Sequence, residues 1–311
     1  GGSKGIPKKN IYPIAGHPLM AYTIAAALAS EVISDVVVST DDEEIASVAR
    51  QYGALVPFMR PAELAGDKVL SVDSLHHAVV ESERILDKQY SYVVELPCVA
   101  PLRNSHDVDA ALKKLIETGA DSVISVVDTG EKHPVRLKKI IDDRIVDFCA
   151  EYPEPKAGSR RQDLKPPSYI RNGAIYAMTR ECIVHKYSRH GDDSRAYIMP
   201  EQRSVNIDTT LDLKFAEFLI AEGYCSKHPQ QMRSCRVEAA SEGKGRPVLV
   251  TAPLHFLPKV REAVVASTDC ILACDAGVPD LIELFSTREV QAWMCSPCPE
   301  YIIDKHVLQH A

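Results

Sequence analysis

Residues 35–40 read DVVVST, a short β-branched run that suits a buried strand. A helical pattern follows at residues 42–52 and is closed by Gly53. Alternation of short β-branched runs with longer helical stretches is typical of an α/β sheet. The same alternation predicts helices at 19–30, 72–86 and 106–118, strands at 92–96, 122–127 and 171–178, and a short strand followed by a helix within 201–222.

Length and composition restrict the class of protein. The 311 residues favour one large domain plus a smaller unit, and the apolar share of 45% suffices for a substantial core. A formal net charge of −7 argues against a general nucleic-acid binder. No run reaches the roughly 18 apolar residues of a membrane span, and the chain opens without a leader pattern. We therefore expect no nucleic-acid partner, no membrane partner and a cytoplasmic location.

The regular alternation is interrupted twice. Residues 133–170 are rich in Pro and charge and predict a β-rich arm that leaves the main body. Residues 226–245 are polar and predict a linker between a domain at 1–225 and a second α/β unit at 246–311. A C-x-x-C pair at Cys295 and Cys298 has no second pair at metal-ligand spacing, so reduced thiols are the better interpretation.

The first ten residues, GGSKGIPKKN, form a basic glycine-rich loop. Glycines let the backbone approach a phosphate closely, and successive N–H groups can form an anion-binding nest. Lys4 and Lys9 could add the positive charge that a triphosphate requires. Neither the P-loop nor the dinucleotide spacing is present, so a solvated basic loop is an equal alternative for this segment alone.

Further motifs follow the loop in a fixed order. They are RPAELAGD at 60–67, PLR at 101–103, RRQDL at 160–164, RNGAIY at 171–176 and SVNIDTTLDL at 204–213. Together with the loop they closely resemble the CMP-sialic acid synthetase (N-acylneuraminate cytidylyltransferase) family, over about residues 1–223. The resemblance implies a Rossmann-like nucleotide-diphospho-sugar transferase sheet with a protruding arm that makes a homodimer. It also implies that CTP and a nine-carbon sugar acid react to give a CMP-sugar and pyrophosphate.

The resemblance also implies roles for individual residues. Catalysis would depend on Lys4, Lys9 and Asp208, and Asp208 with Asn206 would hold Mg²⁺ or Mn²⁺. The nucleotide would be bound by Gly2, Ser3, Lys4, Lys9, Asn10, Arg60 and Ser71. The sugar acid would be bound by Arg103, Arg136, Gln162, Tyr169 and Arg171, because an arginine fork matches a carboxylate. Asp212 is interpreted instead as a cap of the helix that follows it.

Three departures from the family pattern are visible. An apolar strand ending in Ala-Arg normally precedes the glycine loop, and the printed sequence starts after that point, so we expect this chain alone to be impaired. Asn206 replaces the first of two metal-binding aspartates. Pro97 stands where many members have a glutamine that touches the sugar acid, so a legionaminate, pseudaminate or other nonulosonate is an open alternative.

The segment from about 246 to 311 resembles the start of the D-2-hydroxyacid dehydrogenase family. The resemblance depends on PVLVTAPLHFLPKVREAV, CILACDA and VQAWMCSPCPEYIIDKHVL. That family's glycine fingerprint and catalytic residues are not found here, so hydride transfer is not assigned. For the whole chain two alternatives stay open: a sugar-1-phosphate nucleotidylyltransferase, and an inactive nucleotide-binding or scaffold relative.

Overall fold

The structure is a computed structural model that describes residues 5–66, 69–225 and 229, and the backbone of four short strands beyond them. The chain divides into two compact units, residues 1–230 and 231–311. The helices of the first unit are α1 (Leu19–Leu28), α2 (Glu43–Gln51), α3 (Ser71–Leu86), α4 (Ser105–Thr118), α5 (Thr210–Ala221), a π-helix (Glu181–His185) and short 3-10 turns at Lys9–Ile11, Ala62–Leu64, Gly130–Lys132, Pro134–Arg136, Arg161–Asp163 and Glu201–Arg203. Its strands are β1 (Pro13–Ile14), β2 (His17–Pro18), β3 (Tyr92–Glu95), β4 (Ser122–Asp128), β5 (Lys138–Ile141), β6 (Arg144–Asp147), β7 (Tyr169–Thr179) and β8 (Ser194–Ile198).

A four-stranded mixed sheet in the order β3-β7-β4-β8 forms the centre of the first unit. β7 is antiparallel to both β3 and β4, whereas β8 is parallel to β4. One face carries Val123 and Ala177, which pack into a buried cluster with Leu112 and Leu115 of α4. The opposite face carries Ile124 and packs on α3 and the π-helix. Helices on both faces of a sheet confirm the predicted α/β class.

The helix boundaries follow local signals that the sequence carries. Asp42 caps α2 by accepting from the backbone N–H groups of Glu44 and Ile45. Asn104 begins α4 with a reciprocal capping box, and Gly119 ends it with a φ of 62°. Side chains that accept from orphan N–H groups at a helix start are a local device, so sequence is sufficient to predict them.

The predicted strand at 35–40 does not form a continuous ladder. Among the described residues, one bridge joins Val37 to Leu55, supported by hydrogen bonds from Val38 N to Leu55 O and from Leu55 N to Val36 O. The strand predicted within 201–222 is also wrong for the described residues, which form a 3-10 turn and an extended segment before α5. Pairing with distant segments decides whether an extended run becomes a strand, and local pattern does not report it.

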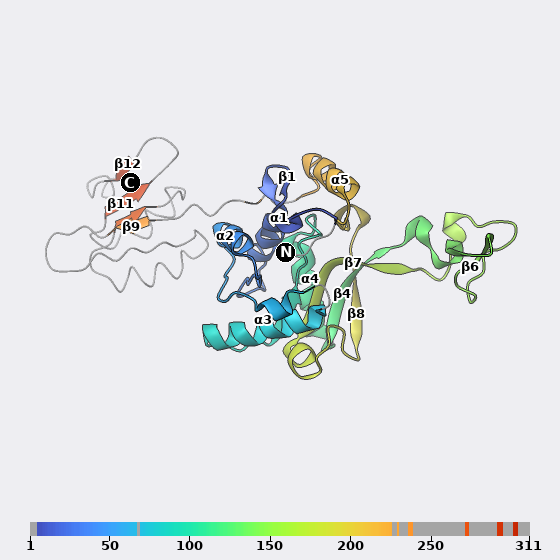
Figure 1. Cartoon of the computed structure of the whole chain (residues 1–311), viewed down its shortest axis with the longest axis horizontal. Helices are drawn as coiled ribbons and strands as arrows, with labels where there is room; N and C mark the ends of the chain where they lie inside the picture. Colours follow the sequence, from blue (N-terminus) through green and yellow to red (C-terminus); the bar gives the residue numbers. More distant parts are fainter. Residues whose placement is uncertain are drawn as a thin grey trace. The chain divides into compact units, whose positions relative to one another are not determined.

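The predicted arm is an excursion between β4 and β7 that ends in the β5–β6 hairpin, drawn away from the helices in Figure 1. Asp142 and Asp143 form its turn with φ values of 48° and 60°. Two positive φ values in a two-residue loop are those of a type I′ turn, whose twist matches that of the flanking strands.

In the second unit the structure describes only four strands. They are β9 (Arg236–Glu238), β10 (Ile271–Ala273), β11 (Gln291–Met294) and β12 (Tyr301–Ile303), in the sheet order β12-β11-β10-β9. β9 falls inside the range predicted as a linker. The remaining residues of the linker and of the dehydrogenase-like segment, with Cys295 and Cys298, lie outside the described residues.

Candidate active site

Lys9 connects the glycine-rich loop to a segment almost 200 residues further along the chain. Its ammonium group donates to the carbonyl oxygen of Ile207 at 2.8 Å and to Asp208 Oδ1 at 3.0 Å. Gly5 approaches the same segment so closely that a Cβ there would lie 2.7 Å from the carbonyl oxygen of Asp208. The loop and the predicted metal-binding carboxylate therefore form one site, and Gly5 is needed for their contact.

The N-terminus of α5 determines where Asp208 lies. Asp212 Oδ2 accepts from the backbone N–H groups of Asp208 and Thr209 and from the Thr209 hydroxyl. These hydrogen bonds hold the pKa of Asp212 below its usual range. The prediction that Asp212 acts as a cap is confirmed. The Asp208 side chain remains 71% exposed, so a ligand can reach its carboxylate.

Asn206, the second residue predicted to hold the metal, packs against β7. A Cβ at Gly173 would lie 2.8 Å from its Nδ2, so Gly173 is a glycine because the amide occupies that space. Within residues 5–66 and 69–225 no group of three or more His, Cys, Asp and Glu side chains could hold a metal ion. The two residues predicted to hold the metal supply one carboxylate and one amide. This set fits Mg²⁺, which usually takes one or two carboxylates together with substrate phosphates and water.

Asn10 and Arg60 line a cavity of about 480 Å³. The backbone N–H of Arg60 donates to the carbonyl oxygen of Thr40 at 2.8 Å, and its guanidinium lies 3.4 Å from Asp41 Oδ1. These contacts place the predicted nucleotide-binding Arg60 next to the extended segment that follows α1. The Arg60 side chain is 20% exposed; it lines the cavity and also pairs with Asp41.

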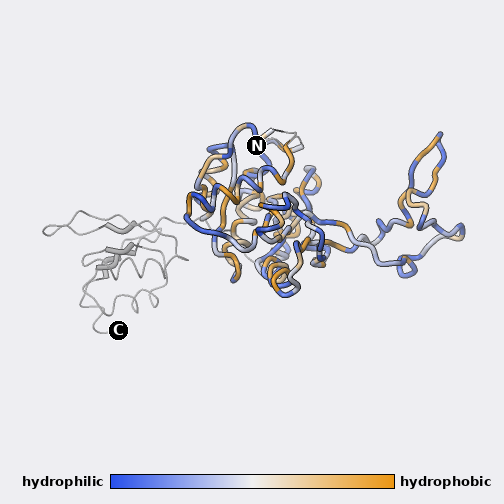
Figure 2. Tube along the Cα trace, turned by 90° about the horizontal axis from the view of Figure 1, so that it is seen from below, coloured by the Kyte–Doolittle hydropathy of each residue, from blue (hydrophilic) through white to orange (hydrophobic). Residues whose placement is uncertain are grey.

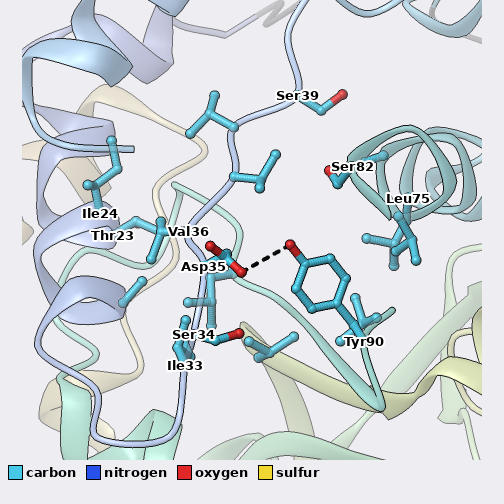
Figure 3. A pocket seen from close by; sticks show the side chains of 18 of the residues that line it. Thr23, Ile24, Ile33, Ser34, Asp35, Val36, Ser39, Leu75, Ser82 and Tyr90 are labelled. Atoms are coloured by element: carbon cyan, nitrogen blue, oxygen red, sulfur yellow. Dashed lines mark hydrogen bonds between the residues drawn. The ribbon is translucent and has the colours of Figure 1, made fainter. Parts of the chain in front are cut away.

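Most of the cavity wall is apolar, as Figure 3 shows for Ile24, Ile33 and Leu75. Its main polar feature is the hydrogen bond from the Tyr90 hydroxyl to Asp35 Oδ2 at 3.1 Å. Burial, and next the carboxylate of Asp35, raise the pKa of Tyr90 to about 12. Such walls suit apolar side chains, so we do not assign the interior of this cavity to a triphosphate.

Arg103, which the resemblance predicts to bind the sugar acid, lies in the core with protein oxygens as its partners. The side chain is only 2% exposed. Its guanidinium donates to the carbonyl oxygens of Ala174 and Pro97, at 2.7 and 2.8 Å, and to the Thr23 hydroxyl. Burial lowers the pKa of Arg103 to about 10, which still leaves it charged at neutral pH. The two terminal nitrogens of the guanidinium thus join β7, α1 and the segment after β3, whereas its Nε is buried without a hydrogen-bond partner.

Arg171 is placed by an irregularity in β7. Tyr176 pairs with Ile124 and Arg171 pairs with Val126, so four residues of β7 stand opposite Ser125 alone. Directly paired residues share a face, and so do residues two apart on β4. Arg171 and Tyr176, five positions apart, therefore lie on the same face of the sheet, whereas a regular strand would put them on opposite faces. A bulge of this kind re-aims a side chain next to a site.

The remaining predicted sugar contacts belong to the arm. Arg136 pairs with Glu131 and donates to Ser159, and Gln162 is exposed in a 3-10 turn beside a second cavity of about 410 Å³. Tyr169 is 46% exposed where the arm returns into β7. The structure thus does not bring Arg136 and Gln162 together with Lys9, because the arm runs away from α1 and α5 (Figure 1).

Ser71 is the exposed first residue of α3. The other nucleotide contacts that we predicted, Gly2, Ser3 and Lys4, lie outside the described residues. The sequence interpretation missed Glu95, Tyr176, Arg189 and His190, which gather on the same sheet face as Arg171. No motif contains Glu95, Arg189 or His190, which come from β3 and the loop before β8, and Tyr176 ends the RNGAIY motif without having been given a role. None of the helices within the described residues is long and apolar enough to cross a membrane.

Comparison with known proteins finds a matching family profile and several relatives. A profile described as cytidylyltransferase matches residues 1–217. The chain is 32% identical to a pseudaminic acid cytidylyltransferase of Campylobacter jejuni, over 70% of this chain and 92% of the relative. It is 33% identical to a CMP-N,N'-diacetyllegionaminic acid synthase of Legionella pneumophila, over 70% and 92%. An N-acylneuraminate cytidylyltransferase of Escherichia coli is 32% identical over 69% of this chain and 49% of its own length.

A solved structure shows the same fold at lower identity. The CMP:2-keto-3-deoxy-manno-octonic acid synthetase in complex with CTP matches with a TM-score of 0.53 and 17% identity, covering 71% of this chain and 95% of that one. The similarity supports the Rossmann-like nucleotidyltransferase sheet predicted from sequence. With a family profile that matches more than two thirds of the residues, this chain belongs to the cytidylyltransferase family.

Proposed function

We propose that the protein transfers CMP from CTP to the anomeric hydroxyl of a nonulosonic acid and releases pyrophosphate. The observation that carries the proposal is the contact of Lys9 with Ile207 and Asp208, because it joins the loop predicted for the triphosphate to the carboxylate predicted for the metal. The names of the relatives support a sugar acid of the sialic, pseudaminic or legionaminic class as acceptor.

In the proposed reaction the anomeric oxygen forms a bond to the α-phosphorus, the bond between that phosphorus and the bridging oxygen breaks, and the hydroxyl proton passes to solvent. Negative charge accumulates on the phosphate oxygens, so catalysis depends mainly on positioning and on fixed positive groups. Lys9 suits this role because its stem is largely buried, at 13% exposure, and its ammonium group is oriented by two protein oxygens. Arg171 would hold the carboxylate of the acceptor in a planar fork.

The proposed metal is Mg²⁺ or Mn²⁺, held by Asp208 with help from the Asn206 amide. When bound, it would neutralise charge on the phosphates of CTP. An amide oxygen contributes less charge than the aspartate that the family pattern has at this position, so we expect weaker binding of Mg²⁺. Changing Asn206 to Asp tests this expectation, because the variant should reach half-maximal activity at a lower Mg²⁺ concentration.

The arm is the proposed homodimer contact. Its hairpin exposes large apolar side chains, with Ile140 75%, Ile145 73% and Phe148 62% exposed. Figure 2 shows these hydrophobic segments alternating with hydrophilic ones along the arm. Burial of such side chains against a second copy would be favourable, and it would bring Arg136 and Gln162 to the partner's site. Sedimentation of the full-length protein and of an Ile140→Lys, Ile145→Lys variant tests this, with a dimer expected only for the unmodified protein.

The activity test measures pyrophosphate released by the full-length protein. Release should require both CTP and a nonulosonic acid, and we expect it with at least one of the sialic, legionaminic and pseudaminic acids. Lys9→Ala should lower kcat/KM by about 10²–10³-fold, the usual effect of losing one group that stabilises transition-state charge. Lys8→Ala is the matched control, because Lys8 lies in the same loop, pairs with exposed Glu44 and is not among the residues predicted to bind the nucleotide.

Two outcomes would replace the proposal. Stabilisation by another nucleoside triphosphate, with turnover of a sugar-1-phosphate, would support the alternative nucleotidylyltransferase activity. No stabilisation by CTP with Mg²⁺ would support an inactive scaffold, since a ligand that binds only the folded state must raise its apparent stability. We also propose a cytoplasmic location, which fractionation of the source cells would test.

A further inference from the structure

The segment at residues 203–208, which leads to Asp208, is anchored to the protein core at two points. At its start, the guanidinium of Arg203 donates to both carboxylate oxygens of Asp107, at 2.9 and 2.8 Å, and the Asp107 side chain is completely buried. Near its end, the backbone N–H of Ile207 donates to the carbonyl oxygen of Val99 at 2.8 Å. The position of Asp208 therefore depends on the chain that runs between these two anchors.

Between the anchors, Ser204 is bound by the side chain of Asn172 in β7. The Nδ2 of Asn172 donates to the Ser204 hydroxyl oxygen at 2.9 Å and lies 3.2 Å from the sulfur of Met199. The Ser204 hydroxyl in turn donates to the carbonyl oxygen of Pro200 at 2.8 Å. Because the only proton of this hydroxyl is donated to Pro200, its oxygen can only accept from residue 172. Position 172 therefore needs a side chain with a hydrogen-bond donor.

The other end of the same amide organises the bulge of β7. The Oδ1 of Asn172 accepts from the Ser125 hydroxyl at 2.6 Å and from the backbone N–H of Ala174 at 3.2 Å. The Ser125 hydroxyl also accepts from the N–H of Ile175 at 2.8 Å. Asn172 is 4% exposed and Ser125 is completely buried. A buried amide whose oxygen and nitrogen both have partners is held in one orientation, since any rotation would leave a polar group unsatisfied.

The bulge contacts the segment at 203–208 a second time through the next residue. Gly173 has a φ of 70°, and the amide of Asn206 occupies the space in which a Cβ would lie. Two neighbouring residues of β7 thus contact two residues of this segment, Ser204 by a hydrogen bond and Asn206 by packing. Asp208 follows two residues after Asn206, and its carboxylate accepts from Lys9.

We propose that Asn172 is a positioning residue for the proposed phosphate and metal site. Through Ser204 it fixes the segment that carries Asn206 and Asp208, so that the Asp208 carboxylate is held opposite Lys9. The inference rests on the proposed function and adds to it a buried residue that acts through another. A misplacement of about 1 Å can reduce the rate of an enzyme about 10²-fold. We expect a smaller effect from the loss of this contact, because the anchors at Arg203 and Ile207 remain.

Calorimetric titration of the full-length protein with CTP, at a series of Mg²⁺ concentrations and without a sugar acid, tests the proposal. Asn172→Asp keeps the shape of the side chain but places an oxygen where Ser204 needs a donor, and Ser204→Ala removes the other partner with a milder change. Each variant should raise the Mg²⁺ concentration for half-maximal CTP binding about 10-fold. The double variant should show no more than the larger single effect, because both changes break the same contact.

Ser125→Ala is the matched control, because it removes a hydrogen bond at the opposite end of the same amide. It should lower the Tm at least as much as Ser204→Ala does, since it also leaves the N–H of Ile175 without a partner. The Mg²⁺ concentration for half-maximal CTP binding should nevertheless stay within about 2-fold of the unmodified protein, because the contact from Asn172 to Ser204 remains. A purely structural role of Asn172 predicts instead that the two serine variants change the Mg²⁺ dependence equally.

Steady-state kinetics provides a second measurement. Ser204→Ala should raise the KM for CTP about 10-fold and leave the KM for the sugar acid unchanged, because the bulge that places Arg171 keeps its hydrogen bonds to Asn172. An unmodified protein that binds CTP but releases no pyrophosphate with any nonulosonic acid overturns the proposed function, while the titration still tests this inference. An unmodified protein that does not bind CTP with Mg²⁺ overturns both. Equal Mg²⁺ dependence in Ser204→Ala, Ser125→Ala and the unmodified protein overturns this inference alone.

Discussion

The core around Arg103 and the sheet face around Arg171 contain the same residue type in two different physical situations. Arg103 is 2% exposed and its guanidinium is surrounded by three protein oxygens. Arg171 is exposed and has His190 as its hydrogen-bond neighbour. Both lie within short family motifs, PLR and RNGAIY, and both are predicted from the resemblance to bind the sugar acid. Burial and partners distinguish the core arginine from the exposed one, and the motif alone does not.

We expect the largest effect on the free energy of unfolding from Arg103→Ala. The change leaves two carbonyl oxygens and a hydroxyl unsatisfied in the core and creates a cavity. The free energy of unfolding should fall by about 3–5 kcal/mol. Urea denaturation measures it, with Arg84→Ala as an exposed control that should stay within about 0.5 kcal/mol. A stable Arg103→Ala protein with a raised KM for the sugar acid would instead support a role of Arg103 in sugar binding.

Arg171→Ala should show the opposite pattern. The free energy of unfolding should change by no more than about 0.5 kcal/mol, because the side chain is exposed. The KM for the sugar acid should rise about 10- to 100-fold, the range for losing a charged hydrogen bond. Arg171→Lys should be intermediate, since it keeps the charge and loses the planar fork. Equal losses of unfolding free energy in Arg103→Ala and Arg171→Ala would contradict the difference that we infer from burial.

The loop at 188–193, which packs on Asp121 through Gly191 and donates to it from Asp192 and Asp193, predicts a smaller effect on stability. Gly191→Ala has to accept both a φ of 66° and a contact with Asp121, and should cost about 1–3 kcal/mol. Gly158→Ala is the matched control, because its φ is 85° and a Cβ there meets nothing within 4 Å. The difference in unfolding free energy between the two variants isolates the steric part. If Gly158→Ala proves as costly as Gly191→Ala, the close packing of the loop on Asp121 is not important.

The smallest effect should be the pH dependence of the stability that the hydrogen bonds to Asp121 provide. Hydrogen bonds from Lys186, Asp192 and Asp193 lower the pKa of Asp121 to about 2. Since the folded-state pKa lies below the unfolded value of about 3.8, the stabilisation is complete above pH 4 and is lost as the pH falls toward 2. The Tm difference between the unmodified protein and Asp121→Asn should therefore shrink between pH 4 and pH 2.5. A difference that stays constant over that range would contradict this account.

Sequence reasoning predicted much of the local structure and part of the site. The predicted helices at 42–52 and 106–118, the stop at Gly119 and the cap by Asp212 depend on groups within four residues, so pattern is sufficient for them, although the capping residue Asn104 was not predicted. The association of Lys9 with Asp208 followed from a resemblance whose motifs have a fixed order. The role of Arg103 could not be predicted, because its three partners come from α1, β7 and the segment after β3.

By itself the sequence determined the α/β class, the helix boundaries, the arm and the family to which the chain belongs. These features depend on periodicity, capping chemistry and motif order, all of which are properties of the sequence itself. Only the tertiary structure decided that residues 35–40 make a single bridge, that a bulge turns Arg171 onto the Tyr176 face, and that Arg189 and His190 join it there. The reason is that strand pairing, bulges and burial are set by segments distant in sequence, so their energy is not visible in any local pattern.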